Sequence, residues 1–411
     1  MNTWIVQLGE QLQGIDSNTK AYRYTKLAQT LANRGHSVTR ISNTFDHANK
    51  KFRFESFRSV NINTNLKVDL LHATPGYKRN ISIERIIQQR RAAKLFYNYA
   101  EQQPKPDIIV AGIPVLEVAE SCANFAKQNN IPLIIDVQDI WPDVYLEAFP
   151  QIARPLAKKL LKREYSRLRK SLSEAEAITA TSGTYLNWSL KHANRSPRPL
   201  DRIFPLGTDA ILKGPQIASN PDGLPIPPNK KLFTFCGTFG KTYDTDALTE
   251  TAKLLSNNRR NDIHILAAGN GDKLNKARAG AQGLDTITLP GYIDQPTLQS
   301  TLLHSTAGLC AYSSAATQVL PYKPFEYMAA GLPLISSLPG ELEQIIKTNQ
   351  IGLQYEAGNH ISLYEAIVRV ADSNTIEMRS RSKTLFEAEY DSTVLYSKFS
   401  RHLESIIQEL S

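Results

Sequence analysis

The chain has 411 residues, of which 41% are hydrophobic and 21% charged, as is usual for a globular protein of two domains. No apolar run reaches the length of a membrane-spanning helix, and the N-terminus lacks a signal-peptide pattern. Three widely spaced cysteines argue against a disulfide framework and a metal cluster, and they fit a cytoplasmic protein. The net charge of +9 is uneven. Residues 1–200 hold 29 Lys and Arg against 17 Asp and Glu, so an anionic partner would meet the first half.

The first half of the chain alternates short apolar runs with amphipathic helical patterns. This alternation indicates a parallel sheet that is covered by helices on both faces. Strands are predicted at 4–8, 37–41, 107–111, 133–137 and 177–181, and the helices between them include 22–34 and 83–101.

A segment rich in proline and glycine, residues 204–230, lacks periodicity and predicts a domain boundary. We expect two Rossmann-like, doubly wound α/β domains, residues 1–205 and 206–383, facing each other across a cleft. A final helical segment over 384–411 would pack back on the first domain. Ligands of such sheets bind beyond the carboxyl ends of the strands. Strands of the second domain are predicted at 232–236, 263–267, 286–289, 308–312 and 334–336.

The stretch PYKPFEYMAAGLPLISS, residues 321–337, combines a short helix with a buried strand in the second domain. Phe325 and Met328 belong to its apolar face, whereas Lys323 and Glu326 lie three residues apart on another face. If the apolar face packs on the sheet, this pair points into the cleft. There a lysine can neutralise a phosphate, and a glutamate can accept hydrogen bonds from ribose hydroxyls. A solvated ion pair of little energetic weight is the alternative.

Three further turns at predicted strand ends of the second domain carry glycines. Glycine lets the backbone approach an anion, and N–H groups at a helix N-terminus can bind phosphate. Each turn alone also fits a plain connection, but together they would line one crevice of nucleotide size. The candidates are Gly237, Gly240 and Lys241 in the first turn, Gly269 in the second, and Tyr292 and Ile293 in the third, where the tyrosine could flank a base.

Two segments of the first domain could meet a ligand across the cleft. The stretch IIDVQDIWPD places Asp136 and Asp139 at a strand end, where a carboxylate can orient a sugar hydroxyl or accept a proton. Capping of the next helix is the alternative role. The polar loop 8–24, with Gly14 and Arg23, either contacts the acceptor or is simply a loop.

Residues 153–172 are predicted to form one amphipathic helix with a leucine stripe and eight Lys or Arg. A basic amphipathic helix can lie on an anionic membrane surface. The alternative is a helix whose leucines belong to the protein core and whose basic face is solvated.

Taken together, these motifs resemble those of the GT-B glycosyltransferases of family 4, which build bacterial surface polysaccharides. The resemblance runs in the right order over nearly the whole chain, and it is greatest to the branch that transfers N-acetylated sugars. The matching segments are RGHSV at 34–38, DVQDIWPD at 136–143, PLGTD at 205–209, the glycines at 237 and 240, GNG at 269–271, and KPFEYMAAGLP at 323–333.

The resemblance implies that Glu326 binds the donor ribose, that Lys241 or Lys323 holds the diphosphate, and that residues 291–293 lie near the base. The family usually has another glutamate eight residues earlier, where this chain has Gln318, an uncharged amide that can still bond a sugar hydroxyl. The turn that often supplies an arginine for the diphosphate has Thr238 instead. Asp139 and Gln318 are the candidate catalytic residues.

The predicted function is a retaining glycosyltransferase that needs neither metal nor cofactor, since no Asp-x-Asp or histidine cluster follows a strand end. It would move a sugar from a nucleotide sugar to a glycan or lipid-linked acceptor at the inner face of the plasma membrane, stabilising the leaving diphosphate electrostatically. A nucleotide-sugar epimerase of the same fold is the alternative, although it has little use for a membrane-facing helix. A nucleic-acid binder is disfavoured, because the charge lies partly in one helix without interleaved aromatics.

Overall fold

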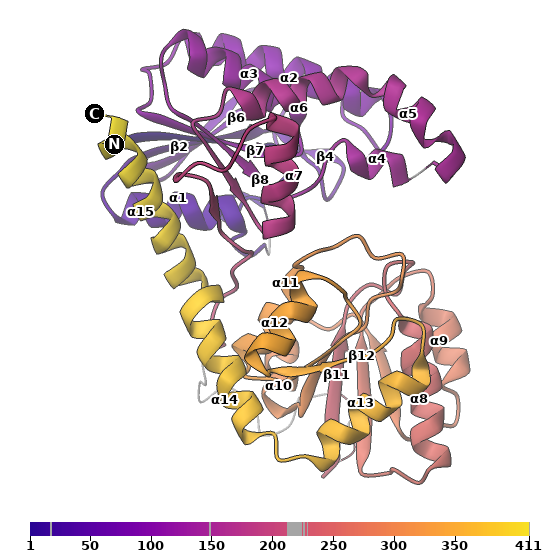
Figure 1. Ribbon diagram of the computed structural model, residues 1–411. Coiled ribbons are helices and arrows are strands. Elements are labelled where there is room, and N and C mark those ends of the chain that lie inside the picture. Colours follow the sequence, from indigo (N-terminus) through magenta and orange to yellow (C-terminus); the bar gives the residue numbers. More distant parts are fainter. Residues whose placement is uncertain (17–18, 148, 212–223, 225–226, 228, 411) are drawn as a thin grey trace. The chain divides into compact units, whose positions relative to one another are not determined.

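The computed structural model describes the chain except residues 17–18, 148, 212–223, 225–226, 228 and 411. The chain divides into two units (Figure 1). Unit 1 consists of Met1–Pro205 and Leu395–Ser411, and unit 2 consists of Leu206–Val394. Much of the predicted linker, above all residues 212–223, lies outside the described residues.

Unit 1 is built on an eight-stranded sheet with the strand order β10-β9-β8-β7-β1-β2-β6-β5. Neighbouring strands are parallel except β5 and β6, which pair antiparallel at one edge. The central strands are almost wholly buried, because helices cover both faces of the sheet. The strands are β1 (Asn2–Val6), β2 (Ser37–Asn43), β5 (Arg58–Asn63), β6 (Leu66–Leu71), β7 (Ile108–Ile113), β8 (Leu133–Val137), β9 (Ala177–Ala180) and β10 (Arg202–Ile203), beside a small antiparallel pair, β3 (Phe45–Asp46) and β4 (Lys51–Phe52).

The helices of unit 1 alternate with these strands along the chain. They are α1 (Arg23–Asn33), α2 (Ile83–Glu101), α3 (Leu116–Gln128), α4 (Asp143–Glu147), the 3-10 turn η1 (Gln151–Ala153), α5 (Arg154–Leu160), α6 (Lys162–Ser173), α7 (Gly183–Ala193) and α15 (Ser392–Leu410).

The C-terminal helix α15 supplies part of the core of unit 1. Leu395, Tyr396, Phe399, Leu403 and Ile406 lie in one buried cluster with residues of α1, β1, β7 and β8. The ring of Phe399 stacks on that of Phe204, with 4.2 Å between the ring centroids. The last residues of the chain are therefore needed to close the core of the first unit.

Unit 2 is built on a six-stranded, all-parallel sheet with the order β13-β12-β11-β14-β15-β16. Its strands are β11 (Lys231–Cys236), β12 (Ile263–Ala268), β13 (Ile287–Gly291), β14 (Ala307–Cys310), β15 (Leu334–Ser336) and β16 (Gly352–Gln354). Its helices are α8 (Thr245–Asn257), α9 (Leu274–Gly280), α10 (Gln295–His304), α11 (Tyr322–Ala329), α12 (Glu341–Asn349), α13 (His360–Asp372), α14 (Ile376–Leu385) and the π-helix η2 (Phe386–Tyr390).

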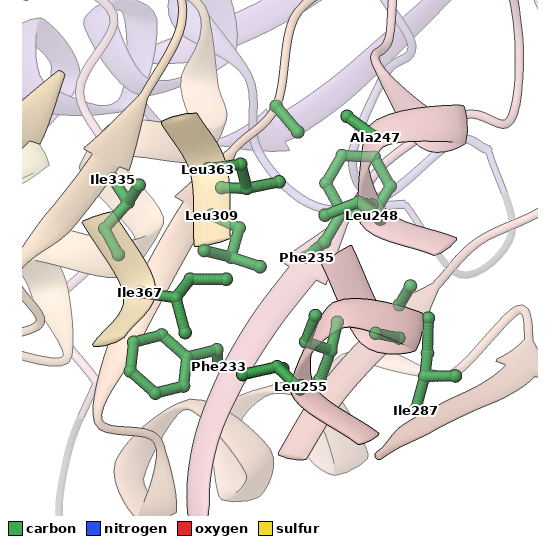
Figure 2. Close-up of a cluster of buried hydrophobic side chains, with 14 of the residues drawn as sticks. Phe233, Phe235, Ala247, Leu248, Leu255, Ile287, Leu309, Ile335, Leu363 and Ile367 are labelled. Carbon is green, nitrogen blue, oxygen red and sulfur yellow. The ribbon is translucent and has the colours of Figure 1, made fainter. Parts of the chain in front are cut away.

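Two buried clusters, one on each face of the sheet, hold unit 2 together. On one face Phe233 and Phe235 of β11 pack against Leu248 and Leu255 of α8 and against Ile367 of α13 (Figure 2). On the other face the apolar sides of α10, α11 and α12 form the second cluster. Helices on both faces of a parallel sheet define a doubly wound unit, so the predicted fold class of two Rossmann-like domains is confirmed.

Two predicted helices differ from the structure. The segment predicted over 384–411 is divided, because α14 ends at Leu385, η2 follows, and α15 begins only at Ser392. The helix predicted over 153–172 is interrupted at Leu161, whose ψ of 10° departs from helical geometry and separates α5 from α6. Within the described residues, no helix is both long and apolar enough to cross a membrane.

Candidate active site

The carboxyl ends of β11, β12, β13 and β14 lie at one edge of the parallel sheet of unit 2. The predicted donor residues follow these strands, so parallel pairing brings their loops to the same edge. Gly237, Gly240 and Lys241 follow β11, Gly269 follows β12, Tyr292 and Ile293 follow β13, and Gln318 lies in the loop between β14 and α11, the helix that carries Lys323 and Glu326.

Backbone hydrogen bonds join the first three loops into one surface. The N–H of Gly237 donates to the carbonyl of Ala268 (3.0 Å), and that of Phe239 donates to Asn270 (2.9 Å). The N–H of Gly269 donates to the carbonyl of Gly291 at 2.7 Å. The three loops therefore hold one another in place.

Glycine at position 269 is required by this contact. Its φ is +138°, and a Cβ there would lie 1.7 Å from the carbonyl oxygen of Gly237. This is a structural use of glycine. The expected binding of phosphate by the turn that contains Gly240 is not favoured, because its own N–H donates to Thr238 (2.9 Å), just as those of Gly237 and Phe239 are engaged.

Lys323 and Glu326 form an ion pair on α11. The Nζ–Oε2 distance is 2.8 Å, and Glu326 is only 6% exposed. Burial lowers the pKa of Lys323, but the Glu326 carboxylate and Cys236 together outweigh this effect and raise that pKa above its ordinary value. Lys323 Nζ also lies 3.6 Å from Cys236 Sγ, at the end of β11. The lysine of the pair therefore lies at the carboxyl end of β11, while its glutamate is buried with the rest of α11.

Tyr327, next to Glu326, anchors α11 to the sheet. Its hydroxyl accepts a hydrogen bond from the N–H of Cys236 at 2.9 Å, and its ring occupies the space that a side chain at Gly308 would fill. Sequence reasoning missed Tyr327 as a positioning residue, although it belongs to the same motif as Glu326.

Lys241 is an exposed cation on the loop after β11. Within the described part of the chain it forms no ion pair. The loop is fixed to the one after β14, because Ser313 Oγ donates to the Lys241 carbonyl (2.6 Å) and the Tyr243 ring stacks on that of Tyr312. Lys241 is thus an exposed cation on a backbone that hydrogen bonds hold in place.

The remaining predicted residues of unit 2 differ in their environments. The Gln318 Oε1 atom is buried and has no hydrogen-bond partner among the described residues. Tyr292 is 74% exposed, whereas Ile293 packs partly against the cluster that includes α11. The Tyr292 ring is therefore accessible to a ligand, whereas Gln318 holds an acceptor without a partner in the interior of the described structure.

Asp139 of unit 1 follows the end of β8. Its Oδ1 accepts a hydrogen bond from the Ile140 N–H and its Oδ2 accepts one from the indole of Trp141, each at 2.9 Å. Burial raises the pKa of Asp139 despite these bonds. Asp139 belongs to unit 1, whereas Gln318 belongs to unit 2.

Arg23 does not lie in an acceptor-side loop. It is the first residue of α1 and is buried, with its guanidinium donating to both carboxylate oxygens of Asp136 at 2.8 Å. It also donates to the carbonyls of Phe204 (2.8 Å) and Pro205 (3.1 Å). Through these hydrogen bonds Arg23 joins α1 to β8 and to the segment at Phe204 and Pro205. Gly14 occupies an exposed turn with φ +86°.

A cavity of about 680 Å³ opens in unit 1 beyond the carboxyl ends of β2 and β6. Burial lowers the pKa of His47 to about 4, and the nearby charges of Lys50 and Arg85 add to this effect. No periodic pattern predicts this cavity, because its lining combines residues of two very short strands, β3 and β4, with the loop before α2 and the first turn of that helix. Its lining includes Phe45, Phe52 and Tyr77 together with Lys50, Lys78 and Arg79.

Among the described residues, no group of three or more His, Cys, Asp and Glu side chains is placed to hold a metal ion. An Asp-x-Asp sequence does occur at the start of α8, at residues 244–246. Asp244 Oδ2 accepts from the Gly358 N–H (2.7 Å), and Asp246 pairs with Lys273 and Lys276. Both carboxylates therefore have partners within the protein.

Comparison with known proteins identifies a family domain in unit 2 and a fold for the whole chain. Residues 216–384 match the family model Glycosyl transferases group 1, and no curated protein sequence matches the chain. Sucrose-phosphate synthase from Thermosynechococcus elongatus is similar over 99% of both chains, with a TM-score of 0.71 and 15% identity. HepE from Anabaena in complex with UDP is similar over 98% of this chain and 99% of its own, with a TM-score of 0.65 and 13% identity. WaaG, a glycosyltransferase involved in lipopolysaccharide biosynthesis, is similar over 97% of this chain and 98% of its own, with a TM-score of 0.62 and 14% identity.

Unit 2 therefore carries a group 1 glycosyl transferase domain, and the whole chain has the fold of the GT-B enzymes. The protein is a glycosyltransferase of the GT-B fold, in agreement with its resemblance to family 4.

Proposed function

We propose that the protein transfers a sugar, with retention, from a nucleoside diphosphate sugar to a glycan or lipid-linked acceptor in the synthesis of a surface polysaccharide. The observation that carries the proposal is the ion pair between Lys323 and the buried Glu326 at the strand ends of unit 2. Lys241, which forms no ion pair among the described residues, lies on the loop after β11 at the same edge of the sheet. One carboxylate suits a ribose and two lysines suit a diphosphate.

The proposed donor is a uridine diphosphate sugar. HepE, which shares the fold, has been solved with UDP and with UDP-glucose, and the enzyme from E. coli that is similar at a TM-score of 0.69 was bound to UDP-2-fluoro glucose. Tyr292 is exposed beside Gly291 and offers a ring to flank the base. The resemblance to the branch that uses N-acetylated sugars supports an N-acetylhexosamine as the sugar.

Each candidate residue has a distinct part in this proposal. Glu326 accepts hydrogen bonds from the ribose hydroxyls. Lys241 and Lys323 neutralise the charge that develops on the leaving diphosphate, so no metal is needed. Gln318 offers its unpartnered Oε1 to a sugar hydroxyl of the donor.

The acceptor is proposed to bind unit 1. The cavity beyond β2 and β6 joins aromatic rings to the cations Lys50, Lys78 and Arg79 and to one carboxylate, Glu84. Such a mainly cationic lining suits sugar rings that carry a phosphate or acidic group. Asp139, with its raised pKa, is a candidate to orient the acceptor hydroxyl.

A thermal-shift screen of the full chain against UDP, GDP, ADP and their sugars tests the donor assignment, because a ligand of the folded state raises the melting temperature. We expect UDP and one UDP-sugar to stabilise the protein most. If free UDP is released only when an acceptor is present, the protein is a transferase. Conversion of the nucleotide sugar without any acceptor would instead establish the epimerase of the same fold.

A further inference from the structure

The helix α5 exposes an apolar face that the protein core does not use. Ile152, just before it, is 93% exposed, and Leu156 and Leu160 are 64% and 75% exposed. A spacing of four residues places these three side chains on one side of the segment. Among the residues of α5, Ala157 alone is buried.

The break at Leu161 explains this exposure. In α6, which follows, Tyr165, Leu168 and Leu172 are buried in unit 1. The leucine pattern that suggests one continuous helix thus serves two purposes. The part in α6 packs in the core, and the part in α5 does not. Figure 1 shows α5 at the end of unit 1 away from α15.

The charges around the exposed face have one sign. Arg154, Lys158, Lys159, Lys162 and Arg163 surround it, all of them exposed, and within the described part of the chain none forms an ion pair. No acidic residue occurs from Phe149 to Arg163. Arg167 of α6, in contrast, is engaged by Glu117, Glu120 and Glu164.

We propose that α5, with Phe149 and Ile152 before it, is a docking element for the surface of an anionic lipid bilayer. The leucines and Ile152 enter the boundary of the acyl chains, while the lysines and arginines contact lipid phosphates. The chemistry favours a bilayer over a second protein, because a row of apolar side chains flanked by unpaired cations complements an apolar interior beneath an anionic layer. The proposal concerns binding and does not depend on the proposed function.

The experiment is co-sedimentation of the full chain with vesicles of phosphatidylcholine, with and without phosphatidylglycerol. We expect binding to the anionic vesicles, its loss in about 0.5 M salt, and weak binding to neutral ones. The substitutions Lys158→Gln, Lys159→Gln, Lys162→Gln and Arg163→Gln together should reduce the partition coefficient by about a hundredfold or more. Leu156→Ser with Leu160→Ser should reduce it about tenfold or more.

Matched controls separate this surface from the general positive charge of the protein. The charge control replaces Arg259, Lys276, Lys347 and Arg369 of unit 2 by Gln, and the apolar control replaces Ile361 and Ile376 by Ser. All six are exposed in the structure. Both controls should bind as the wild type does. Thermal melts verify that every variant is folded.

Two results would overturn the proposal. One is a wild type that ignores anionic vesicles at low salt, or α5 variants that bind no worse than their controls. The other is sedimentation velocity without lipid that shows a wild-type dimer and a monomeric Leu156→Ser, Leu160→Ser variant, since the face would then be an interface between two copies.

Discussion

Lys323 and Glu326 lie one turn apart on α11 with 2.8 Å between Nζ and Oε2, and the glutamate of the pair is almost fully buried. A carboxylate in such a place is stable only with a charged or hydrogen-bonded partner. The lysine is that partner here. A single ligand could replace this pairing, because its hydroxyl groups could donate hydrogen bonds to Glu326 while its phosphate contacts Lys323.

Glu326→Ala should weaken the binding of UDP about ten- to a hundredfold, because a hydrogen bond to a charged group typically contributes about 1.5–3 kcal/mol. Isothermal titration of UDP into the variant measures the change. Glu365→Ala, an exposed glutamate of α13, is the matched control and should bind UDP normally. Equal affinity of both variants would remove Glu326 from the site.

Lys241→Ala should weaken the binding of UDP more than the binding of uridine, because the Lys241 ammonium is proposed to contact the diphosphate and not the nucleoside. The expected loss is about tenfold for UDP and slight for uridine. Lys347→Ala, on the exposed side of α12, serves as the control. Should UDP and uridine lose affinity by the same factor, Lys241 would act on the loop and not on phosphate.

Turnover should persist in EDTA. The proposal assigns charge neutralisation to Lys241 and Lys323, and Asp244 and Asp246 are held by protein groups. Initial rates with and without chelator, after prior dialysis, decide the point. Loss of activity that Mg²⁺ or Mn²⁺ restores would show that a metal shares this task.

The attachment of α15 should weaken in acid. Hydrogen bonds from Arg34, together with His36, lower the pKa of Glu404 to about 2 from its ordinary 4.5. Because the folded state has the lower pKa, the carboxylate stabilises the fold above about pH 4.5, and this stabilisation is lost as the pH falls toward 2.

Glu404→Gln should therefore cost about 1 kcal/mol or less at pH 7, since the pair is partly exposed and screened, and the difference from wild type should shrink toward pH 2. Urea unfolding at both pH values measures it. Glu409→Gln, an exposed residue of the same helix, is the control. A difference that does not change with pH would assign Glu404 a packing role only.

Arg23→Ala should destabilise unit 1 by about 3–5 kcal/mol, because it leaves Asp136 charged and buried without its partner. Denaturant unfolding measures the loss. In the double variant Arg23→Met, Asp136→Leu, most of the stability should return. If the Arg23→Ala variant is stable but binds the acceptor poorly, the result would instead support the acceptor contact that the sequence predicts for Arg23.

The interior strands could be predicted because burial on both faces leaves an apolar run. Leu133–Val137 is a strand over the predicted residues. β5, RSVNIN, was not predicted, since an antiparallel edge strand is mostly polar and exposed, and β16 has only three residues. The interruption at Leu161 was hidden because the leucine spacing continues through it.

The site shows the same limits. Lys323 and Glu326 could be found because the apolar period of α11 leaves them on the other face. The role of Arg23 could not be predicted, because no local sequence pattern shows that this arginine pairs with Asp136, which lies 113 positions away. The cavity lined by Phe45 and Tyr77 arises from two very short strands, a loop and the start of α2, which only the folded chain brings together.

The contribution of α15 to the core of unit 1 has a consequence for biosynthesis. Residues 1–205 leave the ribosome first, yet the cluster around Phe204 lacks Phe399 and Leu403 until the last residues have been made. Unit 2 contains all its strands between these two segments, so the later unit is the first that can be completed. A nascent chain stopped before Leu395 should carry a protease-resistant unit 2 and a first unit whose exposed apolar groove awaits the final helix and, until it arrives, is open to chaperones.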